Sequence, residues 1–513
     1  LTDVTGVQTC ALPISILQNQ HFNVSQAVDA LIEIRELRLF GPSTQAIVDE
    51  AEARNIPAIR LDSYNLVQLG TGKYHKRVRA TLTSDTNLIS VETADNKYLT
   101  NLMLQDAGVP VLPTIKTTKV SEIIAFQKKI NTPIVIKPYS GYLGKNLMVN
   151  LTTKEQIKQG LKLAKSFDSV VLAQPYKEGN TFRVLVIDYK FVAATHLKPP
   201  AIIGNGKSTI EELIHAENEN PLREKGDKGK LTKIEIDDIT TNILKRKGYT
   251  LKTILNTGEE LKIKNSGNLK LGGEAINVTE SIHPFNIFLV ERAAKVIGLN
   301  VAGIDIIAPE LSTPLNSNGG IVLEVNAAPD FRMHLNPTIG KSINVARSLL
   351  DMLFPDTLKT RVPIFSVTGT VGKTICVSLL KHCLQSHGST TGLATSDGLY
   401  IQNHRLMEGE MTYPEHVGLV LKDPTIDCAI LETSREGILR DGLGYKFADY
   451  GIVLNIHNDH VGADDIKYIE DLAYAKSVVA EEVYEDGYTI LNADNDLVID
   501  MKTRLYSRLA LFS

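Results

Sequence analysis

The chain of 513 residues contains no tryptophan and only four cysteines, Cys10, Cys376, Cys383 and Cys428. Cysteines this far apart show neither the framework of a disulfide-stabilised domain nor the paired spacing of a zinc site. This usage fits a reducing compartment, so we expect a cytoplasmic protein. The sequence also lacks an apolar run of the ~18 residues that a membrane-spanning helix needs. A disulfide scaffold and a membrane protein are therefore not expected.

An excess of one charge sign is also missing. Lys and Arg number 55 against 59 Asp and Glu, which gives a formal net charge of -4. Without a basic excess, neither nucleic acid nor an anionic membrane is an expected partner. Hydrophobic residues make up 43% and charged residues 22%, as is usual in globular proteins. The length predicts about two to four domains.

The two ends of the sequence are unusual. Residues 1–15, LTDVTGVQTCALPIS, have no basic segment and do not form a signal peptide pattern. They resemble a translated sequencing adapter, and we expect them to lie outside the fold. Residues 16–40 carry a helical apolar pattern and are predicted to be the tail of an N-terminal domain. The sequence stops within the apolar stretch RLALFS, and we interpret it as a fragment at both ends.

The body of the sequence has two patterns. Between residues 41 and 355, short β-branched strands alternate with amphipathic helices, which indicates an α/β or α+β domain. The predicted strands are 134–136, 170–172, 183–187 and 321–325, and the predicted helices are 95–106 and 284–296. Residues 205–273, rich in Lys, Glu, Asn and Gly, predict a solvated insertion with its own helices. From 361 to 513, strand–loop–helix repeats indicate a doubly wound parallel sheet.

Lys137 ends an apolar predicted strand and is followed by the loop SGYLGK. A lysine at a strand end can reach nucleotide phosphates, and glycines such as Gly141 and Gly144 let backbone N–H groups approach them. A lysine beside a turn is more often simply solvated. This motif therefore indicates a phosphate site only together with further evidence.

That evidence lies in two later strands. The stretch GIDII carries one inward acid, Asp305, and the stretch LEVNAAP carries Glu324 and Asn326. Residues two apart on a strand share one face. Carboxylate and amide oxygens are the ligands that Mg²⁺ prefers. Asp305 alone could be a cap or an ion-pair partner, but the three together favour a metal site.

A second phosphate motif stands in IFSVTGTVGKT, residues 364–374. The pattern predicts a strand, a phosphate loop and then a helix through Leu384. Val367 stands where the longer Walker pattern has its first glycine, so the loop has the shorter form Gly-Thr-x-Gly-Lys-Thr. Lys373 is expected to reach the β- and γ-phosphates and the Thr374 hydroxyl a Mg²⁺. The strand–loop–helix context argues against a chance match.

Longer segments carry a family resemblance. Residues 41–355, with GPSTQAIVDEAEARNIPAIRL, GLNVAGIDIIAPEL and EVNAAPDFRMHLNPTIGK, resemble the ATP-grasp domain of cyanophycin synthetases nearly end to end. Residues 361–513 resemble the central domain of Mur ligases, and DPTIDCAILETSREGILRDGLG is similar to cyanophycin synthetases in particular. The resemblance implies an α/β and α+β multidomain chain: an ATP-grasp fold, then a truncated Mur-ligase-like P-loop sheet. Because Mur ligases have a further C-terminal lobe, we expect the Mur-like part to be incomplete.

The resemblance also implies site residues. In the ATP-grasp part it implies Lys97 and Lys137, with the loop glycines Gly141 and Gly144, as the ATP site. It implies Arg183 and Arg332 as catalytic charge clamps, and Asp305, Glu324 and Asn326 as Mg²⁺ ligands. In the Mur-like part it implies a nucleotide site at Gly369, Thr370, Gly372, Lys373 and Thr374, with Lys373 catalytic. It implies Thr374, Glu432 and His460 as metal ligands there. Lys476 matches the lysine that Mur enzymes carbamylate, with a plain surface lysine as the alternative.

The family implies a ligase that makes cyanophycin with ATP and Mg²⁺. The ATP-grasp site would add aspartate to the backbone of a polymer primer, and the Mur-like site would add arginine to the aspartate side chain. We expect a homo-oligomer. Residues 142–143 (Tyr-Leu) and 195–197 (Thr-His-Leu) depart from the family, which leaves the substrate open. The alternatives are a peptide ligase of other amino-acid specificity and a non-catalytic paralogue that binds nucleotide or polymer.

Overall fold

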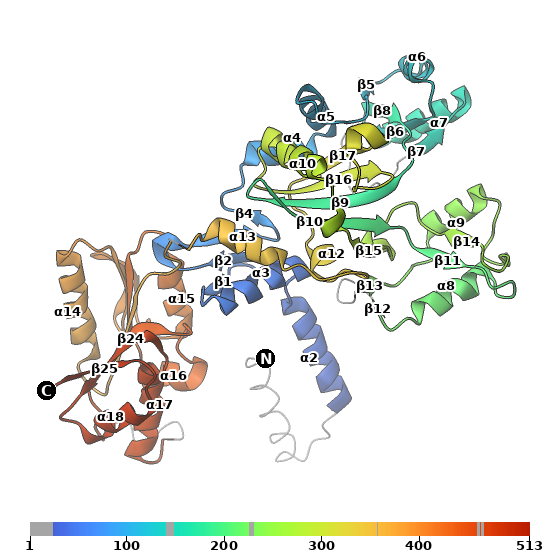
Figure 1. Cartoon of the computed structure of the whole chain (residues 1–513). Coiled ribbons are helices and arrows are strands. Elements are labelled where there is room, and N and C mark those ends of the chain that lie inside the picture. Colours follow the sequence, from blue (N-terminus) through green and yellow to red (C-terminus); the bar gives the residue numbers. More distant parts are fainter. Residues whose placement is uncertain (1–23, 140–147, 225–229, 357, 459–461, 463–465) are drawn as a thin grey trace. The chain divides into compact units, whose positions relative to one another are not determined.

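The computed structural model describes residues 24–139, 148–224, 230–356, 358–458, 462 and 466–513. The chain divides into two compact units (Figure 1). The first comprises Leu1–Ile47, Ser63–Asn65 and Arg79–Leu353, and the second Val48–Asp62, Leu66–Val78 and Phe354–Ser513. The predicted domain bounds, 41–355 and 361–513, stay a prediction. Within the described ranges, no helix is long and apolar enough to cross a membrane.

The larger sheet of the first unit has five antiparallel strands. Their order is β15 (Glu274–Asn277), β10 (Lys190–Lys198), β9 (Asn180–Ile187), β16 (Val301–Ala308) and β17 (Ile321–Asn326). One face packs on α10 (Pro284–Ile297), α4 (Leu88–Asp95) and α5 (Lys97–Asp106). Alternate strand residues such as Val184, Val186, Ile304 and Ile306 form the core on that face. The residues between them point to the opposite face, because side chains alternate along a strand.

A smaller antiparallel sheet of the same unit has the order β5 (Ile115–Thr117), β8 (Val171–Pro175), β6 (Ile134–Pro138) and β7 (Met148–Leu151). Helices α6 (Val120–Ile130) and α7 (Lys154–Lys165) pack on one of its faces. Ile134 and Ile136 of β6 belong to the core under these helices. Lys137 follows Ile136 on the same strand, so it points to the face that the helices leave open.

The predicted insertion has a core of its own. It contains α8 (Ile210–Asn218), β12 (Arg223–Glu224), β13 (Leu231–Thr232), α9 (Asp238–Arg246) and β14 (Glu260–Lys262), and β14 pairs with β11 (Ala201–Ile203), which lies just before the predicted bounds. Helix α8 begins with a capping box between Thr209 and Glu212, which satisfies backbone N–H groups at its first turn. The first unit also contains α2 (Val24–Arg38), the start of α3 (Pro42–Ala53, which runs into the second unit), β4 (Leu82–Thr83), α11 (Leu315–Asn318), α12 (Arg332–Leu335) and α13 (Val345–Leu353).

The predicted strands and helices of this unit are present, with one correction. The helix predicted over 95–106 is α5, which begins two residues later at Lys97, because Asp95 is the last residue of the preceding helix α4. Asn96 stands between them, and its side chain accepts a hydrogen bond from the backbone N–H of Leu99. Asparagine is a favoured N-cap, so it starts a new helix here. Lys97 is therefore the first residue of α5.

The second unit contains an eight-stranded sheet. The order is β21 (His404–Glu408), β20 (Gly398–Ile401), β19 (Thr391–Ala394), β22 (Cys428–Glu432), β18 (Ile364–Thr368), β23 (Ala448–Val453), β24 (Val483–Asn492) and β25 (Arg508–Phe512). Strands β19 to β25 in this order are parallel, and β20 and β21 form an antiparallel edge. Parallel neighbours need crossover connections, here helices. These are α14 (Lys373–Ser386), α15 (Pro414–Lys422), α16 (Arg435–Asp441), α17 (Ile469–Glu481) and α18 (Asp496–Ile499).

Helices cover both faces of this sheet. Ile430 of β22 packs in the core that also holds Val377 of α14. Its neighbours Ala429 and Leu431 pack in the core that holds Val417 of α15. Because successive side chains point to opposite faces, α14 and α15 lie on opposite sides. The sheet is thus doubly wound, as the sequence predicts.

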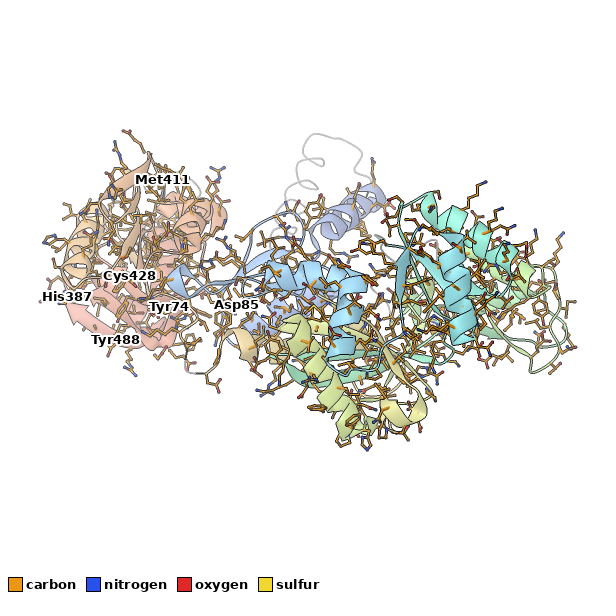
Figure 2. All side chains as sticks on the ribbon, turned by 90° about the horizontal axis from the view of Figure 1, so that it is seen from above. Tyr74, Asp85, His387, Met411, Cys428 and Tyr488 are labelled. Atoms are coloured by element: carbon orange, nitrogen blue, oxygen red, sulfur yellow. The ribbon has the colours of Figure 1, made fainter. Side chains whose placement is uncertain are left out.

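Two early stretches of the chain, residues 48–62 and 66–78, complete this unit. We call them together the early segment. It holds β1 (Ala58–Arg60), β2 (Leu66–Leu69) and most of β3 (Lys76–Arg79). Tyr74 packs against the core of the second unit, in the region of Cys428 (Figure 2).

Polar contacts fasten the early segment. The buried Gln68 side chain donates a hydrogen bond to the backbone oxygen of Leu421 at 3.1 Å. Lys73 pairs with Asp427, which precedes β22. Gly72 has a positive φ of 58°, and a Cβ there would lie 2.3 Å from a methyl carbon of Val362. A glycine is therefore required at this close approach.

Candidate functional sites

Strand register builds the first site. The pairing aligns Thr195 of β10 with Arg183 of β9, Arg183 with Asp305 of β16, and Asp305 with Glu324 of β17. These four residues form one row across the sheet, on the face opposite the core under α10. Asn326 follows two residues after Glu324 and shares its face. The sheet thus gathers residues that are far apart in sequence.

Arg183 and Asp305 form a two-pronged ion pair in the middle of this row. The guanidinium Nη2 donates to Asp305 Oδ2 at 3.0 Å, and Nε donates to Oδ1. Burial acts to lower the pKa of Arg183, but the adjoining Asp305 carboxylate outweighs it, and the pKa is raised. Two parallel N–H···O bonds fix both orientation and charge. The pair is therefore a rigid, charged element of the site.

Two lysines meet the row at Glu324. Lys97, at the start of α5, places its Nζ 3.3 Å from Glu324 Oε2. Lys137 reaches the same neighbourhood from β6: burial lowers its pKa to about 8, helped by the charge of Lys97 and opposed by that of Glu324. Burial alone would raise the pKa of Glu324, but the lysines bring it below its usual value. Three cationic side chains, those of Arg183, Lys97 and Lys137, therefore stand beside two carboxylates, those of Asp305 and Glu324. A surplus of positive charge of this kind favours the binding of an anion.

The predicted Mg²⁺ ligands converge here. Asn326 Nδ2 donates to Asp305 Oδ2 at 3.2 Å, and Asp305 and Glu324 are register partners. Nowhere in the described chain do three or more His, Cys, Asp or Glu side chains cluster for a metal. Mg²⁺ is usually bound through one or two carboxylates plus substrate phosphates, not by an all-protein cage. Two carboxylates and one amide beside the pair Lys97 and Lys137 fit that donor set.

Arg332 and its neighbour His334 lie on the short helix α12. Arg332 is buried and donates a hydrogen bond through Nη2 to Thr232 of the insertion at 3.1 Å. The Nδ1 of His334 lies 2.9 Å from the Thr195 hydroxyl, at the end of the row. Burial, with a smaller effect of Arg183, lowers the pKa of His334 to about 3, so the ring is neutral near pH 7. The sequence did not predict this Thr195–His334 pair.

The phosphate loop of the second unit follows β18. Gly369 and Gly372 have φ of 155° and 85°, and the second of these is left-handed backbone that favours glycine. Lys373 donates to the backbone oxygens of Gly369 at 3.1 Å and Thr370 at 3.3 Å. The backbone N–H of Thr370 donates to Asn455. The loop is thus tied to the strand end beside it.

Lys476 of α17 joins this loop. It is 3% exposed, and its Nζ donates to the Gly369 oxygen at 3.0 Å. Burial lowers its pKa to about 7, and Lys373 and Arg435 add to the effect. Lys476 is therefore not a plain surface lysine.

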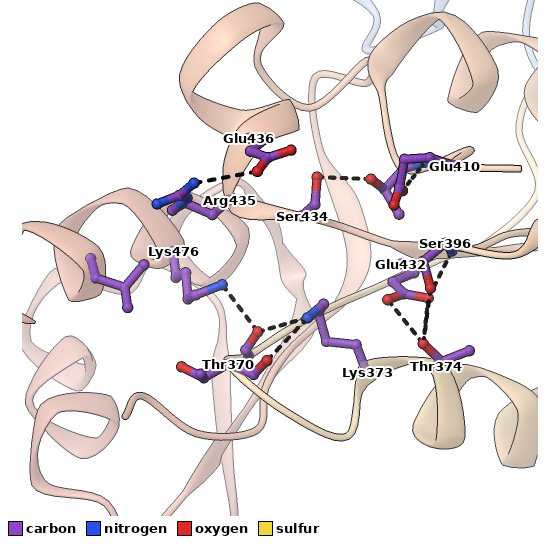
Figure 3. A pocket seen from close by; sticks show the side chains of 13 residues that line it. Thr370, Lys373, Thr374, Ser396, Glu410, Glu432, Ser434, Arg435, Glu436 and Lys476 are labelled. Carbon is purple, nitrogen blue, oxygen red and sulfur yellow. Dashed lines mark hydrogen bonds and ion pairs between the residues drawn. The ribbon is translucent and has the colours of Figure 1, made fainter. Parts of the chain in front are cut away.

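A carboxylate faces the other side of the loop. Glu432, the last residue of β22, accepts hydrogen bonds from the Thr374 hydroxyl at 3.1 Å and from the Ser396 N–H at 3.2 Å. Thr374, Glu432, Lys373 and Lys476 line one pocket of about 270 Å³ (Figure 3). A hydroxyl and a carboxylate beside a phosphate loop fit a Mg²⁺ that also binds nucleotide.

Three predicted site residues lie outside the described residues. They are Gly141 and Gly144 of the first nucleotide loop and His460 of the second metal set. The roles predicted for the remaining site residues stay predictions.

Known proteins match the chain over nearly its whole length. The family model of the Mur ligase middle domain matches residues 367–513. The cyanophycin synthetase of Geminocystis herdmanii is 41% identical over 505 residues, which covers 97% of this chain and 58% of that protein. That of Trichormus variabilis is 43% identical over 477 residues, covering 92% and 53%. The chain is thus similar to cyanophycin synthetases along nearly all of its own length.

The folds predicted for the two units are confirmed. The first has the ATP-grasp fold and the second that of the Mur ligase middle domain, as predicted. A crystal structure of a bifunctional glutathione synthetase from Pasteurella multocida is similar with a TM-score of 0.49 and 27% identity, covering 64% of this chain and 46% of that one. The chain spans somewhat over half the length of the cyanophycin synthetases it matches.

Proposed function

We propose that the chain belongs to an ATP-dependent amide ligase that makes cyanophycin and uses Mg²⁺. The ATP-grasp unit adds aspartate to the backbone of a polymer primer, and the Mur-like unit adds arginine to the aspartate side chain. The observation that best supports this is the convergence of Lys97 and Lys137 on the row that holds Asp305 and Glu324. Cations beside Mg²⁺-type ligands are what phosphoryl transfer to a carboxylate requires.

The chemistry has two steps at each site. A carboxylate oxygen attacks the γ-phosphorus of ATP, the bond to the bridging oxygen breaks, and ADP leaves an acyl phosphate. An amine then attacks the acyl carbon, phosphate departs, and the nitrogen loses a proton to water. Bound Mg²⁺ would offset phosphate charge, held by Asp305, Glu324 and Asn326 in the first unit and by Thr374 and Glu432 in the second.

The lysines carry the protein's own part of the charge compensation. In the first unit Lys97 neutralises Glu324 at 3.3 Å. With a divalent cation bound at the carboxylate, Lys97 and Lys137 would be free to hold phosphate oxygens. In the second unit Lys373 starts helix α14 at the end of the phosphate loop, where the helix dipole also favours an anion.

Two variants test whether each of the two sites carries out only one of the two additions. In the complete gene product, Lys373→Ala should stop arginine addition, while a primer ending in an aspartate–arginine unit still accepts aspartate. Lys137→Ala should stop aspartate addition, while a primer ending in bare aspartate still accepts arginine. Each loss should be on the order of 10²-fold, as for one preorganised donor. Primer extension is read by mass with each amino acid supplied alone.

The outcome that contradicts this scheme is equal loss of both additions in both folded variants. In that case one reaction per site is wrong.

A ligase of different amino-acid specificity is the second candidate. It is favoured by Thr195, which occupies the end of the row and pairs with the neutral His334. The family that the chain resembles has an arginine-bearing stretch where this chain has residues 195–197 (Thr-His-Leu). The charge beside the substrate would therefore differ. Extension assays with a panel of single amino acids distinguish the candidates: preference for another amino acid over aspartate favours the second.

A further inference from the structure

The loop of residues 327–331 joins two parts of the first site. It begins after Asn326, the last residue of β17, and it ends where α12 begins with Arg332. His334 follows on α12 and meets Thr195 at the end of the row. The path of this loop therefore decides where the side chains of α12 stand relative to the row.

The loop lies directly against the sheet beside Arg183. A Cβ added at Gly303 of β16 would lie 2.7 Å from Pro329 Cβ and 3.3 Å from Arg183 Cδ. Only glycine allows so close an approach between the strand and the loop. Burial acts to lower the pKa of Arg183, Asp305 chiefly raises it, and the carboxylate of Asp330 in the loop adds to the rise.

Hydrogen bonds from α3 fix this loop. The Ser43 hydroxyl donates to Asp330 Oδ1 at 2.9 Å and accepts from the backbone N–H of Phe331 at 2.9 Å. The same Asp330 oxygen accepts from the backbone N–H of Arg332, also at 2.9 Å. Bonds to a charged oxygen are stronger than neutral ones, and the burial of Ser43 strengthens them further. Ser43 and Asp330 therefore set where α12 begins.

A single hydrogen bond holds the His334 ring within the described chain. Its Nδ1 meets Thr195, whereas Nε2 is buried and has no partner among the described residues. Met333 packs in a small apolar cluster with residues of β10 and β15, which keeps α12 on the sheet. The direction in which Arg332 and His334 point thus depends on how α12 starts, and Asp330 sets that start.

We propose that Asp330, held by Ser43, is a positioning residue for the amino-acid substrate of the first site. It keeps Arg332 and His334 in place at the Thr195 end of the row, where that substrate binds. The identity of the substrate as aspartate, and the role of Arg332 as its charge clamp, rest on the proposed function.

The row separates this end of the site from the nucleotide. Thr195 and Glu324 stand on β10 and β17, which are three strand spacings apart, or about 14 Å at ~4.8 Å for each spacing. Lys97 and Lys137 meet the row at its Glu324 end. A shift of α12 should therefore weaken amino-acid binding and leave ATP binding unchanged.

Two substitutions at one position test the proposal in the complete gene product. Asp330→Asn keeps an oxygen acceptor at the same place, and Asp330→Ala removes it. In Asp330→Ala, kcat/KM for aspartate should fall about tenfold or more, because a small misplacement of a binding group is costly. The KM for ATP should change less than about twofold, as for distant sites. Asp330→Asn should keep kcat/KM for aspartate within about threefold of the parent.

The matched control is Asp106→Ala, which removes the same charge from the exposed end of α5. It should leave both substrates within about twofold of the parent. Ser43→Ala should resemble Asp330→Ala. The double variant should lose about as much as the worse single variant, because residues of one hydrogen-bond network do not act additively.

Hydrogen exchange read by mass needs no catalysis. Residues 327–336 should exchange faster in Asp330→Ala than in the parent, and at the parent's rate in Asp330→Asn. Unchanged exchange in Asp330→Ala, equal losses for ATP and aspartate, or additive losses in the double variant would each overturn the proposal. If the parent prefers another amino acid to aspartate, the proposed function fails, and the same comparison with that amino acid decides the role of Asp330. If the parent adds none, hydrogen exchange decides it.

Discussion

The pKa of Lys137 leads to a quantitative prediction for ATP binding. Burial lowers this pKa from 10.5 to about 8, with Lys97 as a further cause. The shift means that the charged form of the amine is less stable by roughly 3 kcal/mol in the folded chain than at its ordinary pKa. ATP phosphate offsets that cost, so the bound form should hold the proton more tightly. ATP affinity at the first site should therefore fall as the pH rises above about 8.

The size of the fall follows from linkage. One proton taken up on binding predicts about a thirtyfold loss of affinity between pH 7 and pH 9.5. Stability has the opposite trend: between pH 8 and 10.5 the unfolded chain keeps a proton that folded Lys137 has lost. The free energy of unfolding therefore rises with pH in that window through this group.

Calorimetry in buffers of different ionisation enthalpy measures both affinity and proton uptake. The measurement is made in the Lys373→Ala variant, so that ATP binding at the second nucleotide site does not contribute to the measured heat. Lys137→Arg is the matched control, because a guanidinium stays charged across this range. A flat affinity profile in the lysine protein, or an equal fall in the arginine variant, would refute the reasoning.

Three further outcomes are expected. Glu324→Ala should abolish aspartate addition in primer extension, because it removes one of two carboxylates from the metal site; activity within a few-fold of the parent would remove the metal assignment. Lys476, with a pKa of about 7, is partly a neutral amine at pH 7 and should attack CO₂ to form a carbamate with release of a proton. ¹³C-bicarbonate NMR should show a carbamate carbon that Lys476→Met lacks, and identical spectra would contradict this. Gly72→Ala should lower the stability of the second unit by about 1–3 kcal/mol in urea unfolding, because its Cβ meets Val362; an unchanged midpoint would show that the segment can shift.

Local patterns predicted much of the fold. The strand, loop and helix around Lys373 follow from a short apolar run, glycines with unusual φ and a helical apolar period. Glu324 and Asn326 could be grouped because they lie two positions apart on one predicted strand and so share a face. In these cases the information is contained within a few neighbouring residues.

Contacts over long sequence distances could not be predicted in this way. Thr195 and His334 meet only because α12 packs on β10, and each looks ordinary in its own segment. The hydrogen bond from Gln68 to Leu421 joins residues 353 positions apart. Nothing in the local sequence of the early segment indicates that it completes the second unit and not the first.

The early segment has a consequence for synthesis. About 275 residues separate Val78 from Phe354, where the rest of its unit begins. At about 5–20 residues per second, the ribosome needs about 15 to 55 s to produce them. During that time Ile59 and Tyr74 have no apolar partners from the later core, and the intervening ATP-grasp unit can fold first. The second unit is thus the last to close. A shortened gene that begins at residue 354 would omit the early segment, although that segment is part of the second unit.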